Sequence, residues 1–232
     1  IKDWLKNIII FFPILFSSQL FNTTYYFNLF SGFIVFCILS SFVYVLNDIL
    51  DIKDDQKHPI KKNSKPIASG QISIKIAYLI LAILLILVLA SIYVYESIRS
   101  NIISYLLIIL IYNFGLKKIP YIEILILTLG YIIRTDSGSN IINVDSSILM
   151  LSSIFCIGCF FILLKRLSEL NLIGQKNLTT RKVLKYYNLN LIKILSIFLI
   201  IILSFIFISY IYLVNIKLIF CFSLIILFLL RY

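Results

Sequence analysis

Residues 47–55 read Asn47-Asp48-Ile49-Leu50-Asp51-Ile52-Lys53-Asp54-Asp55, and they follow directly on an apolar run at 27–46. If the helix of that run continues through them, Asp48, Asp51 and Asp55 fall within about 60° of one another on one helix face. Three carboxylates so placed repel one another unless a cation lies among them, and such hard oxygen ligands suit Mg²⁺. The segment therefore predicts a Mg²⁺ site at a membrane boundary. A solvated, charged helix end is the alternative interpretation.

The composition indicates a membrane protein. The chain has 232 residues, of which 61% are hydrophobic, and its mean hydropathy is +1.05, whereas soluble domains are roughly 45–50% apolar. Runs long enough to cross about 30 Å of hydrocarbon recur along the sequence. We predict an all-α fold, a polytopic transmembrane helix bundle, as a single transmembrane domain over 1–232. About eight spans are present on this prediction, at 8–22, 27–46, 73–95, 101–116, 119–135, 146–164, 188–211 and 213–230.

The ends of the chain suggest trimming. The sequence has no initiator Met, and it stops at Tyr232 directly after an apolar run, so we expect both ends to be trimmed. The first apolar run lacks a small-residue cleavage site, which predicts that it is not a cleaved signal peptide.

The distribution of charge predicts the orientation in the membrane. The formal net charge is +11, from 21 basic and 10 acidic residues, and in a soluble protein this would suggest a nucleic-acid partner. Here all basic residues except Arg99, Arg134 and Lys217 fall on one predicted side, which includes both termini and the long connections 47–72 and 165–187. Because basic loops stay in the cytoplasm, we predict a multi-pass protein of a bacterial-type plasma membrane. Its site would face the cytoplasm, and it would bind no nucleic acid.

A basic loop follows the acidic residues. It contains Lys61, Lys62 and Lys65 after His58-Pro59. A diphosphate needs such an arrangement, with metal on one side and ammonium groups on the other. A polybasic patch against anionic lipid headgroups is the alternative for the lysines. For His58, a role in structuring the loop competes with ligation.

Two motifs carry a resemblance to a known family. The pattern Asn47-Asp48-x-x-Asp51-x-x-x-Asp55 resembles the first Asp-rich motif of the UbiA-type intramembrane prenyltransferase superfamily. The segment that runs from Tyr112 to Leu116-Lys117 is similar to its Tyr-x-x-x-Leu-Lys motif. The resemblance implies the superfamily fold of nine helices around a cavity open to the bilayer. It further implies that the last helix is missing from the spans predicted here.

The superfamily normally has a second Asp-rich motif, and this chain departs from it. At the matching place stands Leu164-Lys165-Arg166-Leu167-Ser168-Glu169-Leu170, which is similar to the decaprenyl-phosphate phosphoribosyltransferase subgroup. Trp4-Leu5-Lys6-Asn7 and the loop from His58 to Gly70 also resemble that subgroup. Two features depart from the subgroup: Lys65 stands where Arg is usual, which loses bidentate phosphate binding, and Asp136 lies in the stretch after Arg134. A straight helix would carry Arg134 roughly 24 Å from the cytoplasmic site, so we expect it to have a structural or topological role.

The resemblance implies an intramembrane phosphoribosyltransferase of cell-envelope biosynthesis. The donor would be phosphoribosyl pyrophosphate, the acceptor a polyprenyl (decaprenyl-like) phosphate, and the cofactor Mg²⁺ on Asp48, Asp51 and Asp55, which are the expected catalytic residues. Lys165 and Arg166 would bind a phosphate, and Glu169 would orient Arg166 or a ribose hydroxyl. The remaining expected substrate-binding residues, which bind donor phosphates or line the cytoplasmic mouth, are Asn47, Lys6, Lys61, Lys62, Lys65, Tyr112 and Lys117.

Two other functions remain open from the sequence. A conventional UbiA-type prenyltransferase would move a prenyl group from its diphosphate to an aromatic or other acceptor, and the missing second Asp-rich motif argues against it. A transporter or channel would place ionisable residues deep within spans, whereas Glu123, Arg134, Lys193 and Lys217 lie near predicted span ends. No oligomeric state follows from the sequence.

Overall fold

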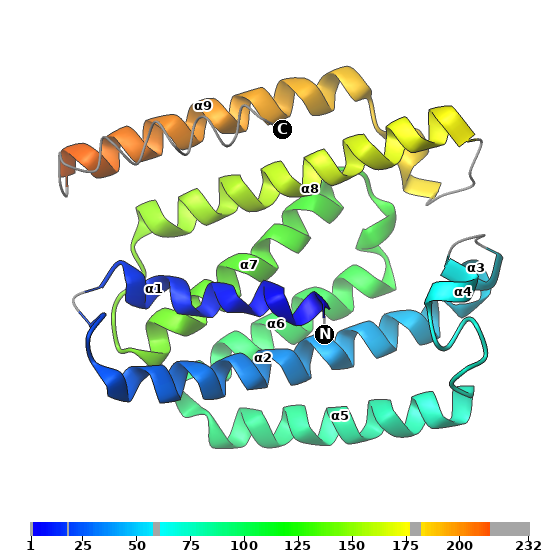
Figure 1. Ribbon diagram of the computed structural model, residues 1–232, viewed down its shortest axis with the longest axis horizontal. Coiled ribbons are helices and arrows are strands. Elements are labelled where there is room, and N and C mark those ends of the chain that lie inside the picture. Colours follow the sequence, from blue (N-terminus) through cyan, green and yellow to red (C-terminus); the bar gives the residue numbers. More distant parts are fainter. Residues whose placement is uncertain (1, 18, 58–60, 177–181, 214–232) are drawn as a thin grey trace. The chain divides into compact units, whose positions relative to one another are not determined.

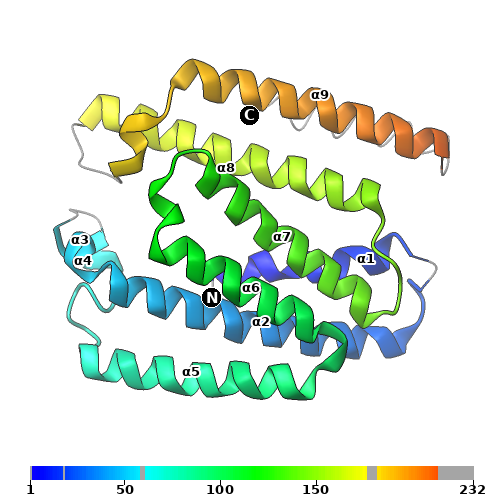
Figure 2. The same ribbon diagram turned by 180° about the vertical axis from the view of Figure 1, so that it is seen from behind.

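The structure is a computed structural model that describes residues 2–17, 19–57, 61–176 and 182–213. Every regular element within these ranges is a helix, which confirms the predicted all-α fold (Figures 1 and 2). In chain order, with α for α-helices and η for 3₁₀-helices, the elements are η1 (Lys2–Phe11), α1 (Phe12–Leu15), α2 (Thr23–Leu50), α3 (Ile52–Lys57), α4 (Lys61–Ser64), α5 (Ile74–Val94), η2 (Glu96–Ile98), α6 (Arg99–Phe114), η3 (Leu116–Lys118), α7 (Ile122–Ile141), α8 (Ile148–Lys176), η4 (Lys182–Tyr186) and α9 (Leu189–Leu213).

Within the described residues, five helices are long and apolar enough to cross a membrane. They coincide with the spans predicted at 27–46, 73–95, 101–116, 146–164 and 188–211. Their observed bounds are Thr23–Leu50, Ile74–Val94, Glu96–Phe114, Ile148–Asn171 and Leu189–Tyr212.

The other predicted spans differ from what the structure contains. Helix α7 occupies the predicted 119–135 span, but it carries Glu123, Arg134 and Asp136 and ends in a polar stretch, so it is not among those five. The predicted span 213–230 lies outside the described residues except for Leu213, where α9 ends.

The first predicted span, 8–22, is shorter than expected. The apolar helix there covers Trp4–Leu15, which is less than a full membrane crossing. Its end has a local cause. The Ser17 hydroxyl donates to the Ile14 carbonyl (3.1 Å) and accepts the Gln19 N–H (3.2 Å), and such side-chain bonds compete with helical ones.

The chain forms two compact units, and unit 1 comprises residues 1–117 and 133–145. In it α2 lies beside α5, and η1 packs against α2 (Figures 1 and 2). Helix α2 begins where the Asn22 side chain accepts the Thr24 N–H at 3.2 Å, an N-cap that satisfies a donor of the first turn. Its buried residues Phe36 and Leu39 join Tyr105 of α6 in the core of the unit.

Unit 2 comprises residues 118–132 and 146–232, so it takes the first part of α7 together with α8, η4 and α9. Helices α8 and α9 pack side by side along their length (Figure 1). The core contains Leu163 of α8, Leu184 of η4 and Ile192 of α9, all buried. The short η4 therefore contributes apolar side chains to the core of unit 2.

A close backbone approach holds η1 against the end of α7 within unit 1. A Cβ added at Gly138 would lie 2.0 Å from the carbonyl oxygen of Ile10, a distance that no side chain tolerates. Only glycine lets these two backbones meet without displacement. The contact places the first helical segment beside the buried residues described below.

Candidate active site

The acidic residues lie where α2 passes into α3. Helix α2 ends at Leu50, and the Asp51 N–H still donates to the Asn47 carbonyl at 2.9 Å. Helix α3 begins at Ile52, and the Asp55 N–H donates to the Asp51 carbonyl at 2.9 Å. The helical path thus continues through the motif with a break of one residue at Asp51.

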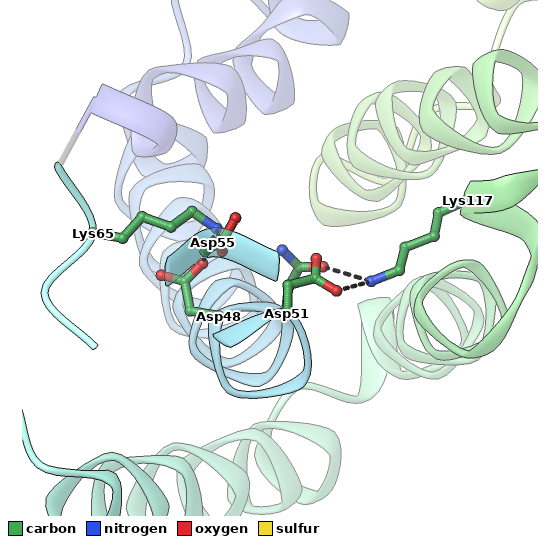
Figure 3. A network of polar contacts seen from close by, with 6 residues as sticks. Asp48, Asp51, Asp55, Lys65 and Lys117 are labelled. Carbon is green, nitrogen blue, oxygen red and sulfur yellow. Dashed lines mark hydrogen bonds and ion pairs between the residues drawn. The ribbon is translucent and has the colours of Figure 1, made fainter. Parts of the chain in front are cut away.

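The first pair of carboxylates shares one lysine. Lys65 Nζ lies 2.6 Å from Asp48 Oδ1 and 2.6 Å from Asp55 Oδ2 (Figure 3). Asp55 is buried, whereas Asp48 and Lys65 are about a quarter exposed, at 23% and 24%. Burial lowers the pKa of Lys65, but the hydrogen bonds and charges of the two carboxylates outweigh it, so the pKa is raised above its ordinary value. Lys65 therefore carries its charge at neutral pH.

The third carboxylate points to a different lysine. Lys117, in η3, brings its Nζ to 2.6 Å from Asp51 Oδ1 and to 3.3 Å from Asn47 Oδ1 (Figure 3). The structure thus brings together six predicted site residues from two distant parts of unit 1. We call them the carboxylate site: Asn47, Asp48, Asp51, Asp55, Lys65 and Lys117.

The expected arrangement of three carboxylates around one cation differs from the observed one. Because the helix breaks at Asp51, its side chain turns to Lys117 while Asp48 and Asp55 turn to Lys65. Among the residues that the structure describes, no three His, Cys, Asp or Glu side chains lie close enough to hold one metal ion together. The donors nevertheless fit Mg²⁺ chemically, since two carboxylates already share one cation and the neighbouring groups offer carboxylate and amide oxygens.

The remaining predicted residues of unit 1 lie elsewhere or at its surface. Lys6 is exposed, and its Nζ donates to the Tyr44 hydroxyl at 3.0 Å. Lys62 is exposed on α4, and Tyr112 is half-buried on α6. Lys61 begins α4, but its side chain lies outside the described residues.

In unit 2, Arg166 lies in a buried ionic cluster. Its Nε is 2.8 Å from Glu123 Oε1, close enough for an ion pair, and one terminal nitrogen donates to Glu123 Oε2 at 3.1 Å. The other terminal nitrogen donates to Glu169 Oε2 at 2.6 Å, so the predicted contact between Glu169 and Arg166 is present. The exposed fractions of Arg166 and Glu123 are 2% and 0%. Lys165, the next predicted phosphate ligand, is exposed on α8.

Tyr187 completes this cluster. Its hydroxyl donates to Glu123 Oε1 at 2.9 Å and accepts the Tyr121 N–H at 3.1 Å. Burial is the main cause that raises the pKa of Tyr187, so the hydroxyl stays protonated as a donor. Sequence reasoning missed Glu123 as the partner of Arg166 and Tyr187 as the partner of Glu123. The only available signal was an acidic residue near the start of a predicted span.

Arg134 is buried in unit 1 within a polar cluster. Its Nε donates to Asn7 Oδ1 at 2.7 Å, and a terminal nitrogen donates to the Tyr105 hydroxyl at 2.6 Å. The guanidinium also lies over the Tyr105 ring, 4.6 Å from its centroid. These contacts agree with the structural role expected for Arg134. Asp136, unexpected in the subgroup pattern, accepts a hydrogen bond from the Asn101 amide at 2.8 Å.

Comparison with known proteins places the chain in a family. The sequence model of the UbiA prenyltransferase family matches residues 8–232. The chain is 31% identical over 157 residues to the decaprenyl-phosphate phosphoribosyltransferase of Mycobacterium tuberculosis, covering 67% of this chain and 52% of the relative. It is 27% identical over 191 residues to the enzyme of the same name from Corynebacterium glutamicum, covering 80% of this chain and 57% of the relative. The chain thus spans about half the length of these relatives.

A solved structure supports the fold. The UbiA homolog from Archaeoglobus fulgidus bound to DMAPP and Mg²⁺ superposes with a TM-score of 0.75, at 17% identity, over 99% of this chain and 82% of that protein. The five apolar helices and the family match together make this an integral membrane protein. The chain belongs to the UbiA prenyltransferase family.

Proposed function

We propose that this protein transfers the 5-phosphoribosyl group of phosphoribosyl pyrophosphate to a polyprenyl phosphate and releases pyrophosphate. The observation that carries the proposal is the carboxylate site, where Lys65 and Lys117 lie against three carboxylates. Carboxylates attract the metal that a diphosphate carries, and ammonium groups attract its phosphates. The choice of phosphoribose rests on the relatives named decaprenyl-phosphate phosphoribosyltransferase.

Mg²⁺ would be held by Asp48 and Asp55, whose carboxylates both contact the Lys65 ammonium group. Asp51 and Asn47 lie beside them. The ion would supply positive charge against the departing pyrophosphate. Lys65 would move from the carboxylates to a phosphate oxygen when metal and donor bind, because it is flexible and partly exposed. Lys117 would make the same exchange from Asp51.

The reaction is a displacement at the anomeric carbon of ribose. The bond from that carbon to the pyrophosphate oxygen breaks, and its electron pair leaves with pyrophosphate. An oxygen of the lipid phosphate forms the new bond, through a transition state of oxocarbenium character, as in other glycosyl transfers. Because the lipid phosphate is already anionic at pH 7, the chain needs no strong general base.

Other cations would assist with binding. Lys62 is exposed on α4, and we assign it, with Lys61, to the phosphates of the donor. Lys165 is exposed on α8, and we assign it to a phosphate of the donor or the acceptor. Arg166 would act through its position rather than as a free phosphate ligand, since two carboxylates already bind it. On the positive-inside rule, the basic loops support a cytoplasmic position for this site.

The test uses the protein reconstituted in vesicles with Mg²⁺ and ribose-labelled phosphoribosyl pyrophosphate. We expect label to enter the organic phase only when a polyprenyl phosphate is present. The Asp48→Asn and Asp51→Asn variants should lose this transfer. Label that stays in the aqueous phase, while a prenyl diphosphate is consumed with an aromatic acceptor, would instead identify a conventional prenyltransferase.

A further inference from the structure

Asn113 of α6 has a buried amide that none of the described residues pairs. Its side chain is 6% exposed, and neither Nδ2 nor Oδ1 has a hydrogen-bond partner in the described part of the chain. Buried side-chain polar atoms are paired in the large majority of cases, because an unpaired one loses its bonds to water without replacement. An amide with both ends unpaired therefore suggests that a partner outside the chain completes it.

The packing of α6 shows where Asn113 faces. Ile102, Tyr105, Ile109 and Asn113 are all buried, and their spacing of three and four residues puts them on one face of the helix. This face packs against α2, where the ring of Tyr105 lies 5.8 Å from the ring of Phe36. Asn113 thus continues a stripe that is turned toward α2.

The contact between Tyr105 and Phe36 also indicates which turn of α2 lies at the height of Asn113. Helices α2 and α6 run in the same direction (Figures 1 and 2), and Asn113 lies eight residues beyond Tyr105. An equal advance of about 12 Å from Phe36 reaches the turn of α2 between Val43 and Asn47. Asn47 is a member of the carboxylate site and accepts a hydrogen bond from Lys117.

Lys117 gives an independent measure of the position of Asn113. It follows Asn113 by four residues, beyond the end of α6 at Phe114 and within η3, and its Nζ lies 2.6 Å from Asp51 Oδ1. Asn113 therefore lies deeper along α6 than the residue that reaches the carboxylate site. A donor bound by the carboxylates and lysines would have to extend along α2 and α6 for its sugar to reach this amide.

The chemistry of an amide selects among ligands. Its nitrogen only donates and its oxygen only accepts, so a single group can satisfy both ends only if it both donates and accepts. Sugar hydroxyls have this property, whereas a phosphate oxygen accepts only and a prenyl chain does neither. We propose that Asn113 is a substrate-binding and specificity-determining residue that hydrogen-bonds a ribose hydroxyl of the donor. This inference rests on the proposed function and names the residue that distinguishes a sugar donor from a prenyl diphosphate.

The test compares Asn113→Leu with the wild-type enzyme in reconstituted vesicles, at saturating concentration of the other substrate. We expect the KM for phosphoribosyl pyrophosphate to rise about tenfold or more, as for a lost hydrogen bond to a substrate hydroxyl. The KM for the polyprenyl phosphate should stay within about threefold. The thermal midpoint in detergent should not fall, because leucine removes an unpaired buried amide. Ile109→Leu, one turn earlier on the same face, is the packing control and should change neither KM.

Donor analogues sharpen the result. One of the two analogues that lack the 2- or the 3-hydroxyl should have the same KM with the wild-type enzyme and with Asn113→Leu. If Asn113→Leu does not fold, Asn113→Ala replaces it with the same expected rise. An unchanged KM for the donor, or a rise confined to the polyprenyl phosphate, would overturn the role of Asn113. Failure of the wild-type enzyme to use phosphoribosyl pyrophosphate at all would instead refute the proposed function. The proposed hydrogen bond from Asn113 to a ribose hydroxyl would then be refuted as well.

Discussion

Two ionic clusters in this molecule each hold one basic side chain between two carboxylates, but their surroundings differ. In the carboxylate site, one lysine lies between Asp48 and Asp55, and it is 24% exposed. In unit 2, Arg166 lies between Glu123 and Glu169, and it is 2% exposed. Water can compete for the lysine, and an ammonium group is a single flexible charge. The guanidinium is planar, bound at several nitrogens and sealed from water.

The difference in exposure determines which cluster can exchange partners. The partly exposed pair of Lys65 and Asp48 contributes little to stability, so it can open for a metal or a phosphate at small cost, whereas the buried Asp55 must keep a cation beside it. A buried pair that loses one member leaves an uncompensated charge in a medium that cannot solvate it. We therefore assign binding to the carboxylate site and structural support to the Arg166 cluster.

Glu123→Ala should cost the most stability. It removes the carboxylate that binds Arg166 at Nε and at one terminal nitrogen. The same carboxylate accepts the hydrogen bond of the Tyr187 hydroxyl. We expect the free energy of unfolding to fall by about 3–5 kcal/mol, the usual penalty for breaking a buried pair. The measurement is reversible unfolding in detergent micelles by titration with dodecyl sulfate. Glu169→Ala is the matched control, and because Glu169 is 26% exposed it should cost about 1 kcal/mol or less. Equal losses in the two variants would contradict the division.

Asp48→Asn should reduce the rate of transfer strongly and the stability little. Transfer should fall about 100-fold or more, because a charge that holds the metal is lost, while the free energy of unfolding changes by about 1 kcal/mol or less. Initial rates of label transfer and the same unfolding titration measure the two effects. The neighbouring Asp54 is exposed, so Asp54→Asn serves as the control and should keep full activity. Loss of folding without a specific loss of transfer would mean that Asp48 is structural.

Gly138→Ala tests a buried position that carries no charge. The new Cβ would meet the Ile10 carbonyl oxygen at 2.0 Å, so the two backbones must move apart. We expect a loss of about 1–3 kcal/mol, as for other overpacked sites, measured by the same titration. Gly115→Ala is the control, since a Cβ there meets nothing within 4 Å. A tolerated Gly138→Ala would show that η1 is not fixed against α7 in this way.

Lys65→Arg should have the smallest effect. The substitution keeps the charge between Asp48 and Asp55, so the free energy of unfolding should change by about 1 kcal/mol or less. The KM for phosphoribosyl pyrophosphate should stay the same or fall, because guanidinium binds phosphate in a bidentate manner. Lys65→Met, which removes the charge at similar length, should raise that KM. A higher KM for Lys65→Arg would show that the lysine serves the carboxylates and not the donor.

Local patterns in the sequence predicted local structure well. The spacing of Asp48 and Asp55 placed them on one side because the helical period survives through the motif. The break at Asp51 was not predicted, since nothing in its neighbours marks a single non-helical residue. The early end of the first apolar helix depends on Ser17, whose side-chain bonds are equally compatible with a longer helix in the sequence alone.

Long-range pairs were beyond sequence reasoning for a physical reason. Arg166 meets Glu123 across 43 residues, and Arg134 meets Asn7 across 127. Such contacts depend on which helix faces are turned together, and helices as apolar all round as these show little facial preference. The contact of Lys117 with Asp51 was anticipated only as a shared site, through the family resemblance. Asn113 lay unnoticed within the same motif.

The most direct test of the central claim compares donors in one assay. Purified protein in vesicles with Mg²⁺ is given either phosphoribosyl pyrophosphate with a polyprenyl phosphate, or a prenyl diphosphate with an aromatic acceptor, and released pyrophosphate is measured. We expect release from the first pair, equal in amount to the phosphoribosylated lipid found by mass spectrometry, and loss of that release in Asp48→Asn. Release from the second pair alone would contradict it.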